Sequence, residues 1–238
     1  MHSANSFITL TYAPEHFPEN GSLDYKHFQR FLKRLRARVG PIRFYMAGEY
    51  GEQFLRPHFH ALIFGYDFPD KVPLGMVSSD NMIYSSDLLF DLWPYGFSSV
   101  GECNFQTAAY VARYVMKKIT GRQAIPHYEV LNYDTGEITR RVPEFNKMSL
   151  KPAIGSTWLA KYFSDVYPHD RVIINSVPTK PPRMYDKILA REFPDIHEDI
   201  KYQRFVDSMD KLADNTDARL AVREVCCKAR LSQLKRTF

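Results

Sequence analysis

Residues 56–65 of this 238-residue chain are RPHFHALIFG, and the rest of the sequence can be interpreted outward from them. Apolar and β-favouring residues follow one another without a helical period until a glycine closes the run, which predicts a β-strand. Because side chains of a strand alternate between its faces, His58 and His60 would share one face. Two neighbouring imidazoles can bind a metal ion, although such a pair is more often two hydrogen-bonded or exposed histidines. The opposite face would anchor the strand in a core through Phe59, Ala61 and Ile63.

The segment before this strand supplies a candidate third ligand. Residues 42–47 are predicted to form a strand, and the glycine-containing loop after them would join it to the histidine strand as an antiparallel hairpin. Glu49 would then lie near the mouth of the hairpin, within reach of His58 and His60, and Glu52 would lie in the loop. Two imidazoles and a carboxylate leave open positions on a divalent ion, one of which a phosphodiester oxygen can occupy. We therefore predict His58, His60 and Glu49 as metal ligands, with Glu52 as an alternative carboxylate.

A second signal lies on a helix predicted for residues 108–119. Tyr110 and Tyr114 are four residues apart and so share a face of that helix. Arg113 and Lys117 each follow a tyrosine by three residues and would flank the same side. The helix could simply be amphipathic, with tyrosines half-buried in a core. Alternatively, a metal-polarised phosphorus and a neighbouring cation would help a phenol, whose pKa is ordinarily about 10, to attack a phosphodiester and remain linked to the DNA.

The helix predicted for residues 24–39 has a basic polar face. Such a face is usually only solvated, but the helix body contains no acidic residue, so a phosphate-facing role stays open. The candidate DNA-binding residues are Arg30, Lys33 and Arg34 on this helix, together with Arg56 and Lys118.

Composition sets few further bounds. A net charge of +5 is compatible with a polyanionic partner, and 15 Tyr and 17 Phe would suit a surface that stacks on bases, although both signals are weak. Three cysteines, two of them adjacent, make no disulfide framework or zinc knuckle, which fits a reducing cytoplasm. The sequence contains no apolar run as long as a membrane span and no signal peptide. A core-type strand begins so close to Met1 that it stays open whether earlier residues are missing.

The order of patterns predicts an α+β fold with a central antiparallel sheet flanked by helices. Residues 66–81 are expected to form an irregular connection, because they contain prolines and show no periodicity. Prolines from position 178 onward would break regular structure, and helical patterning with mixed charge follows them. We therefore expect a main domain over residues 1–177, and a proline-rich connection with a helical C-terminal appendage over residues 178–238.

These motifs together resemble the HUH endonucleases, and in particular the rolling-circle replication initiators of microviruses, with the gokushovirus branch the most similar. The resemblance rests on FITLTY at 7–12, GEYG at 48–51, RPHFH at 56–60 and the spacing of Tyr110, Tyr114 and Lys117. KPAIG at 151–155 and PRMYDK at 182–187 also resemble that branch. The likeness spans most of the chain as far as about Leu189. No single motif is specific, but their combined order is.

The resemblance implies a ferredoxin- or RRM-like sheet with the histidine strand in its middle, residues 1–177 being the nicking-joining domain. It implies Mg²⁺ or Mn²⁺ as the cofactor, and Tyr110 and Tyr114 as alternating nucleophiles, with Arg113 and Lys117 beside them. The enzyme would nick single-stranded DNA at a replication origin, become linked to the 5′ phosphate and leave a 3′-OH primer. Host DNA polymerase and helicase would be its partners, in the cytoplasm of the infected bacterial host. Relatives often carry Lys where this chain has Arg113, and a cysteine-containing N-terminal stretch that it lacks.

Other functions remain open at this point. A transposase or plasmid relaxase of the same class could carry similar motifs, although two tyrosines disfavour the simplest transposases. The protein could also be a non-catalytic single-stranded nucleic-acid-binding module whose tyrosines only stack on bases. A structural or packaging protein that uses its basic surface on phage DNA is a third class. Oligomeric state cannot be predicted from the sequence.

Overall fold

The structure is a computed structural model that describes residues 2–51, 54–78, 81–114, 118–132 and 135–233. The chain separates into two compact units, His2–Leu150 and a second unit that begins at Lys151. The proline pattern predicts a later boundary, at residue 178. The difference arises because Leu159, before the proline-rich stretch, and Leu189, after it, are buried in one apolar cluster. Prolines limit local backbone conformation, but they do not prevent the segments on either side from sharing a core.

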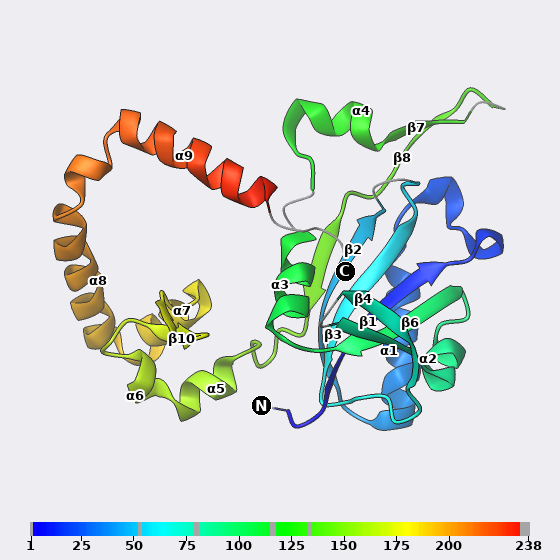
Figure 1. Cartoon of the computed structure of the whole chain (residues 1–238), viewed down its shortest axis with the longest axis horizontal. Helices are drawn as coiled ribbons and strands as arrows, with labels where there is room; N and C mark the ends of the chain where they lie inside the picture. Colours follow the sequence, from blue (N-terminus) through cyan, green and yellow to red (C-terminus); the bar gives the residue numbers. More distant parts are fainter. Residues whose placement is uncertain (1, 52–53, 79–80, 115–117, 133–134, 234–238) are drawn as a thin grey trace. The chain divides into compact units, whose positions relative to one another are not determined.

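The first unit is built on an antiparallel sheet, which has seven strands among the described residues (Figure 1). The order across the sheet is β4-β5-β6-β1-β3-β2-β9, so the histidine strand β3 is interior, between β1 and β2. The predicted α+β architecture and the β2–β3 hairpin are confirmed. The strands are β1 (Asn5–Tyr12), β2 (Arg43–Tyr50), β3 (Pro57–Phe64), β4 (Val72–Ser78), β5 (Asn81–Ser85), β6 (Gly96–Glu102) and β9 (Phe145–Met148).

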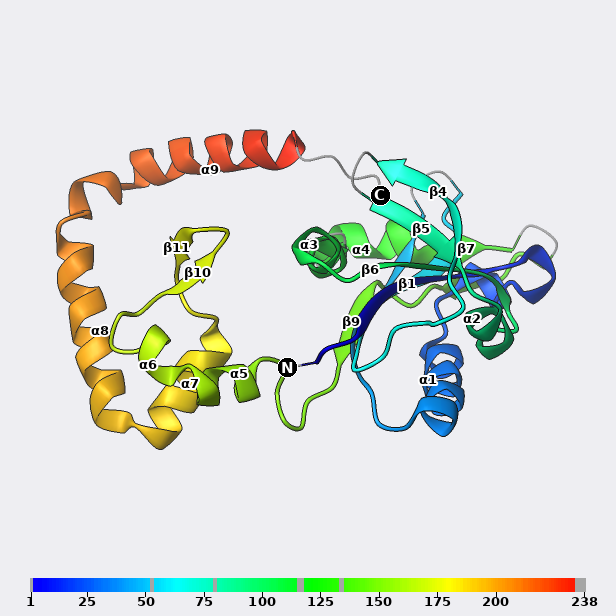
Figure 2. The ribbon, with the colours of Figure 1, turned by 60° about the horizontal axis from the view of Figure 1, so that its bottom comes forward.

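Helices cover the two faces of this sheet separately (Figure 2). One face packs against α1 (Tyr25–Val39) and α2 (Asp87–Leu92), in a core that includes Phe59 and Ile63 of β3. The other face carries α3 (Phe105–Arg113), whose Val111 packs with Phe7, Ala47 and Leu62. Alternation along the strands therefore sorts the side chains, and His58 and His60 lie on the α3 face.

Local sequence explains where these helices begin and end. The Asp24 carboxylate accepts a hydrogen bond from the backbone N–H of Lys26 at 2.8 Å and caps α1, which ends at Gly40 with φ of 83°. Asn104 and Thr107 form a reciprocal capping box at the start of α3. Both candidates that the sequence offers for this cap are therefore used, and α3 begins three residues before the predicted Ala108.

The segment after β3 differs from its prediction as an irregular connection. Residues 72–85 form the hairpin of β4 and β5, and β4 is the outermost strand of the sheet. Pro73 and Gly75 hide this strand from pattern reading, but an edge strand tolerates proline because only one of its sides needs N–H donors. The rest of the first unit consists of α4 (Ala124–Tyr128), the hairpin of β7 (Glu129–Leu131) and β8 (Ile138–Arg140), and short 3₁₀ turns at Pro14–His16, Glu19–Gly21 and Gly121–Gln123.

The second unit is mostly helical, as the appendage was predicted to be. A polar cluster ties its segments together, because the Arg204 guanidinium donates to Asp170 and Asp186, and Tyr167 donates to Asp186. Its elements are α5 (Ser156–Lys161), α6 (Phe163–Val166), β10 (Val172–Ile174), β11 (Val177–Thr179), α7 (Arg183–Glu192), α8 (Pro194–Met209), a 3₁₀ turn (Leu212–Asp214) and α9 (Asp217–Ser232). No helix in the described part of the chain has both the length and the apolar composition needed to cross a bilayer.

Candidate metal and tyrosine site

Three side chains converge at the end of the β2–β3 hairpin. Oε1 of Glu49 lies 2.6 Å from Nε2 of His58 and 3.2 Å from Nε2 of His60. One ligand atom from each of the three residues lies within 4.8 Å of the others. Glu49 and His60 are 2% and 5% exposed, and His58 is half-buried. The register explains the convergence, because Glu49 is paired with His58 across the hairpin.

The outer ring nitrogens of both histidines are held by neighbouring groups. His58 Nδ1 lies 2.9 Å from the carbonyl oxygen of Arg56, and His60 Nδ1 lies 3.0 Å from the hydroxyl of Thr9. A carbonyl oxygen only accepts, so His58 donates through its Nδ1–H. Metal-binding histidines typically make this kind of second contact, which fixes the ring and turns the other nitrogen toward the ion.

The donor set fits a divalent cation. With its proton on Nδ1, a neutral His58 ring points the Nε2 lone pair at a carboxylate oxygen of Glu49, and two acceptors at 2.6 Å require a proton or a cation between them. Burial raises the pKa of Glu49, but hydrogen bonds and charge from His58 and His60 outweigh it and lower that pKa to about 2. An ionised carboxylate with two imidazoles suits Mg²⁺ less than an all-oxygen site does, and suits Mn²⁺ well.

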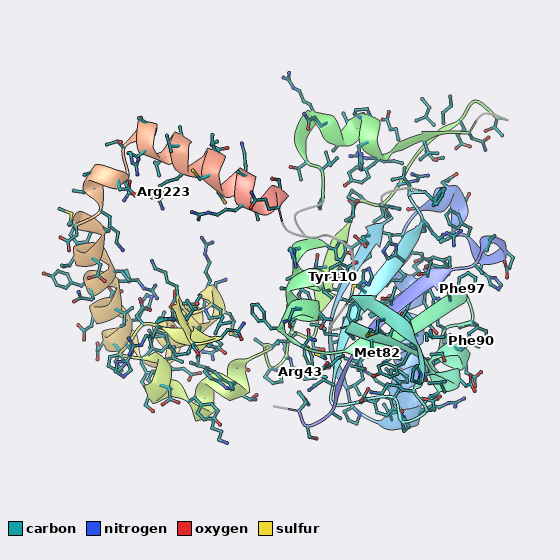
Figure 3. All side chains as sticks on the ribbon, in the orientation of Figure 1. Arg43, Met82, Phe90, Phe97, Tyr110 and Arg223 are labelled. Atoms are coloured by element: carbon teal, nitrogen blue, oxygen red, sulfur yellow. The ribbon has the colours of Figure 1, made fainter. Side chains whose placement is uncertain are left out.

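Both tyrosines of α3 contact His60. The Tyr114 ring is stacked on the His60 ring at 5.2 Å between centroids, and the Tyr110 ring lies edge-on to it at 5.1 Å. The two phenol rings are 4.8 Å apart. Tyr114 is 4% exposed and Tyr110 is half-buried. Figure 3 labels Tyr110 where α3 lies beside the central strands. The fold thus brings the two tyrosines into contact with a histidine that is distant from them in the sequence.

Two residues that the sequence interpretation did not assign to the site support this arrangement. Phe7 is stacked on the His60 ring at 5.6 Å, and Thr9 holds His60 Nδ1. Both come from β1, and the alternation in residues 7–12 already places them on one face. The missing information was the pairing of β1 with β3, in which Thr9 is opposite His60.

The predicted cations are less closely involved. The Arg113 Nε–H donates to the carbonyl of Ala109 in its own helix at 3.3 Å. Lys118 is exposed, after the end of α3. Lys117, and the alternative carboxylate Glu52, lie outside the described residues.

The basic face of α1 is not brought to the site. Arg30, Lys33 and Arg34 belong to a helix that packs on the opposite face of the sheet from Glu49 and the histidines. The Arg34 guanidinium donates twice to the carbonyl of Leu92, at 2.8 and 2.9 Å, and so joins α1 to α2. For these three residues, the predicted contact with DNA at the site is therefore corrected. Arg56 directly precedes β3 and is half-exposed beside the cluster.

Comparisons with known proteins agree with this geometry. The family model of the ORF2-type replication-associated proteins matches residues 5–119, which include all three candidate ligands and both tyrosines. The chain is 29% identical to replication-associated protein VP4 of Bdellovibrio phage phiMH2K over 82% of its own length and 61% of that protein. It is 29% identical to replication-associated protein ORF4 of Chlamydia phage 1, over 80% of this chain and 47% of that one.

A third relative is replication-associated protein ORF2 of Spiroplasma virus 4, which is 27% identical over 80% of this chain and 59% of its own length. The chain therefore spans about half to three fifths of the length of the relatives it matches. No solved structure matches it. The predicted resemblance to microvirus replication proteins is confirmed, and over residues 5–119 this chain belongs to the family of ORF2-type replication-associated proteins.

Proposed function

We propose that this chain initiates rolling-circle replication of a phage genome by nicking and joining single-stranded DNA through a 5′-phosphotyrosine. The observation that carries the proposal is the contact of both α3 phenols with the His60 ring of the Glu49–His58–His60 cluster. A binding module would need neither the buried carboxylate nor its convergence with two imidazoles, since stacking requires only exposed rings. The phage relatives favour replication over transposition or plasmid transfer.

In the reaction, the phenol oxygen of one tyrosine attacks the phosphorus of a phosphodiester. The new O–P bond forms as the bond from phosphorus to the 3′ oxygen breaks, and the phenol proton passes through solvent while the 3′ oxygen takes up a proton. One ester replaces another, so the second tyrosine, or the free 3′-OH, can reverse the step without ATP. When bound, Mg²⁺ or Mn²⁺ would polarise the phosphodiester and stabilise the charge that develops on its oxygens.

The chain's own residues have separate roles in this scheme. Glu49, His58 and His60 would hold the metal. Tyr110 would attack first, because it is the more accessible phenol, whereas Tyr114 is buried against His60. Arg56, next to β3, would contact the DNA backbone. We propose origin DNA as the substrate, host polymerase and helicase as partners, and the cytoplasm of the infected bacterium as the location.

A covalent test decides between this enzyme and a binding module. The full chain is incubated with Mn²⁺ and a randomised single-stranded DNA pool labelled at the 3′ end, because the 3′ fragment is the one that would stay attached. The products are separated on a denaturing gel. We expect a labelled protein band that chelator abolishes.

The matched variants assign the nucleophiles. The double change Tyr110→Phe with Tyr114→Phe should remove the band and preserve DNA binding, and either single change should leave one round of cleavage. Tyr45→Phe, on the same face of the sheet, is the control and should keep the band. A wild-type chain that binds DNA and forms no denaturation-resistant band would overturn the proposal.

A further inference from the structure

A pocket of about 180 Å³ adjoins the candidate site on the α3 face of the sheet. Met82 of β5 and Tyr110 of α3, both labelled in Figure 3, contribute to its lining. His60 and Tyr110 belong to both the pocket and the candidate site. A group in this pocket would therefore touch the same imidazole and phenol that contact a bound phosphodiester.

The pocket exists because β6 presents small residues on this face. Gly101 is paired with Phe7 of β1, and Ser99 is paired with Thr9. A Cβ added to Gly101 would lie 3.1 Å from a ring carbon of Phe7, so a side chain there would press against this ring. Larger residues at these two positions would fill the hollow next to His60.

The lining combines apolar walls with a few polar groups. Phe7, Met82 and Ile83 provide the walls, and the polar groups come from Thr9, Ser99, Glu102 and Thr107. Pockets for drug-sized ligands usually measure about 300–1,000 Å³, so this one suits a single flat heterocycle. Enzymes that act on DNA commonly hold an unstacked base between apolar side chains and recognise its edge by hydrogen bonds.

We propose that this pocket binds the nucleobase next to the scissile phosphate and selects against thymine. The proposal rests on the proposed nicking function, because that function supplies the single-stranded DNA. Its selectivity comes from Glu102, whose side chain is exposed at the pocket and, when ionised, only accepts hydrogen bonds. Adenine, cytosine and guanine offer an exocyclic amino group to such an acceptor, and thymine does not.

The test measures base preference with and without cleavage. A randomised single-stranded DNA pool is selected for binding to the full chain in chelator, and for adduct formation in Mn²⁺, and both products are sequenced. Glu102→Gln replaces the carboxylate with an amide, and Ser99→Leu fills the pocket. Glu129→Gln, at an exposed position of β7, is the matched control. Mn²⁺ binding to each variant reports whether the neighbouring site is intact.

We expect one position next to the nick at which wild type disfavours thymine by about tenfold. Glu102→Gln should reduce this bias at that position alone, and Ser99→Leu should weaken both selection and adduct formation, whereas Glu129→Gln should match wild type. Adducts whose base preference is unchanged in Glu102→Gln and Ser99→Leu would overturn the pocket and leave the nicking function standing. Absence of adduct from wild type would overturn the nicking function, and the chelator selection would still decide whether the pocket binds a base.

Discussion

The hydroxyl of Thr9 is the most informative single group to remove. It lies 3.0 Å from Nδ1 of His60, on a strand that is paired with the histidine strand. Thr9→Val keeps the shape of the side chain and deletes the hydrogen bond. If His60 binds metal through Nε2, the variant should still fold, because a neutral hydrogen bond contributes only about 1 kcal/mol to stability.

Metal affinity should respond more strongly than stability. Loss of a partner that orients a metal-binding histidine typically costs about 10- to 100-fold in affinity. Thr9 is one of two such contacts, since His58 keeps its own through the Arg56 carbonyl. We therefore expect the lower end of that range, a loss of about tenfold, which corresponds to about 1.4 kcal/mol.

The assay is titration of metal-free protein with Mn²⁺, with the free ion measured by electron paramagnetic resonance. Thr11→Val is the matched control, because Thr11 lies on the same face of β1, is paired with His58, and makes no hydrogen bond to either histidine in the described part of the chain. Thr9→Ser retains a hydroxyl and should bind like wild type. Equal Mn²⁺ affinity for Thr9→Val and wild type would refute the orienting role. Equal losses in Thr9→Val and Thr11→Val would assign the effect to the strand instead of the hydrogen bond.

Three further predictions concern stability. Arg204→Met should lower the free energy of unfolding of the second unit by about 2 kcal/mol, measured by urea denaturation, because it leaves Asp170 and Asp186 without their shared cation. Burial raises the pKa of Asp186, but hydrogen bonds from Arg204 and Tyr167 outweigh it and hold that pKa below its usual range. This contribution is complete above the unfolded pKa, near 4, and is lost as the pH falls through the folded value, so Asp186→Asn should flatten the acid limb of a stability–pH curve. Arg34→Met should lower the melting temperature and leave affinity for single-stranded DNA unchanged, because Arg34 joins two helices away from the site; a selective loss of DNA binding would contradict this.

Much of the fold could be predicted because its central elements have strong local patterns. Alternation marks residues 7–12, and a helical period with a cap and a terminal glycine marks α1. The hairpin of β4 and β5 was hidden by Pro73 and Gly75, whose effect depends on the strand being at an edge, which no local pattern reveals. The boundary between the units depends on long-range packing between Leu159 and Leu189, and prolines nearby carry no information about that.

The candidate site divides in the same way. His58 with His60, and Tyr110 with Tyr114, could be found because each pair has the spacing of its own secondary structure. That α3 and the histidines share a face, and that α1 lies on the other, follows from tertiary packing. The basic face of α1 shows the consequence, because its charge pattern was visible but its location relative to the site was not.

The placement of the ligands on interior strands has a consequence for how rigid the site is. Phe59 is fully buried between the two histidines in sequence and packs in the α1 core, so the backbone that positions His58 and His60 is fixed from the opposite face. Glu49 is held by its register with His58, and β1 holds His60 from the other side. A site on strands that are paired on both sides is preorganised, whereas the tyrosines sit on a short helix that packs through a few residues such as Val111. Exchange between two nucleophiles requires movement, and this division assigns that movement to α3 while the metal-binding residues stay in place.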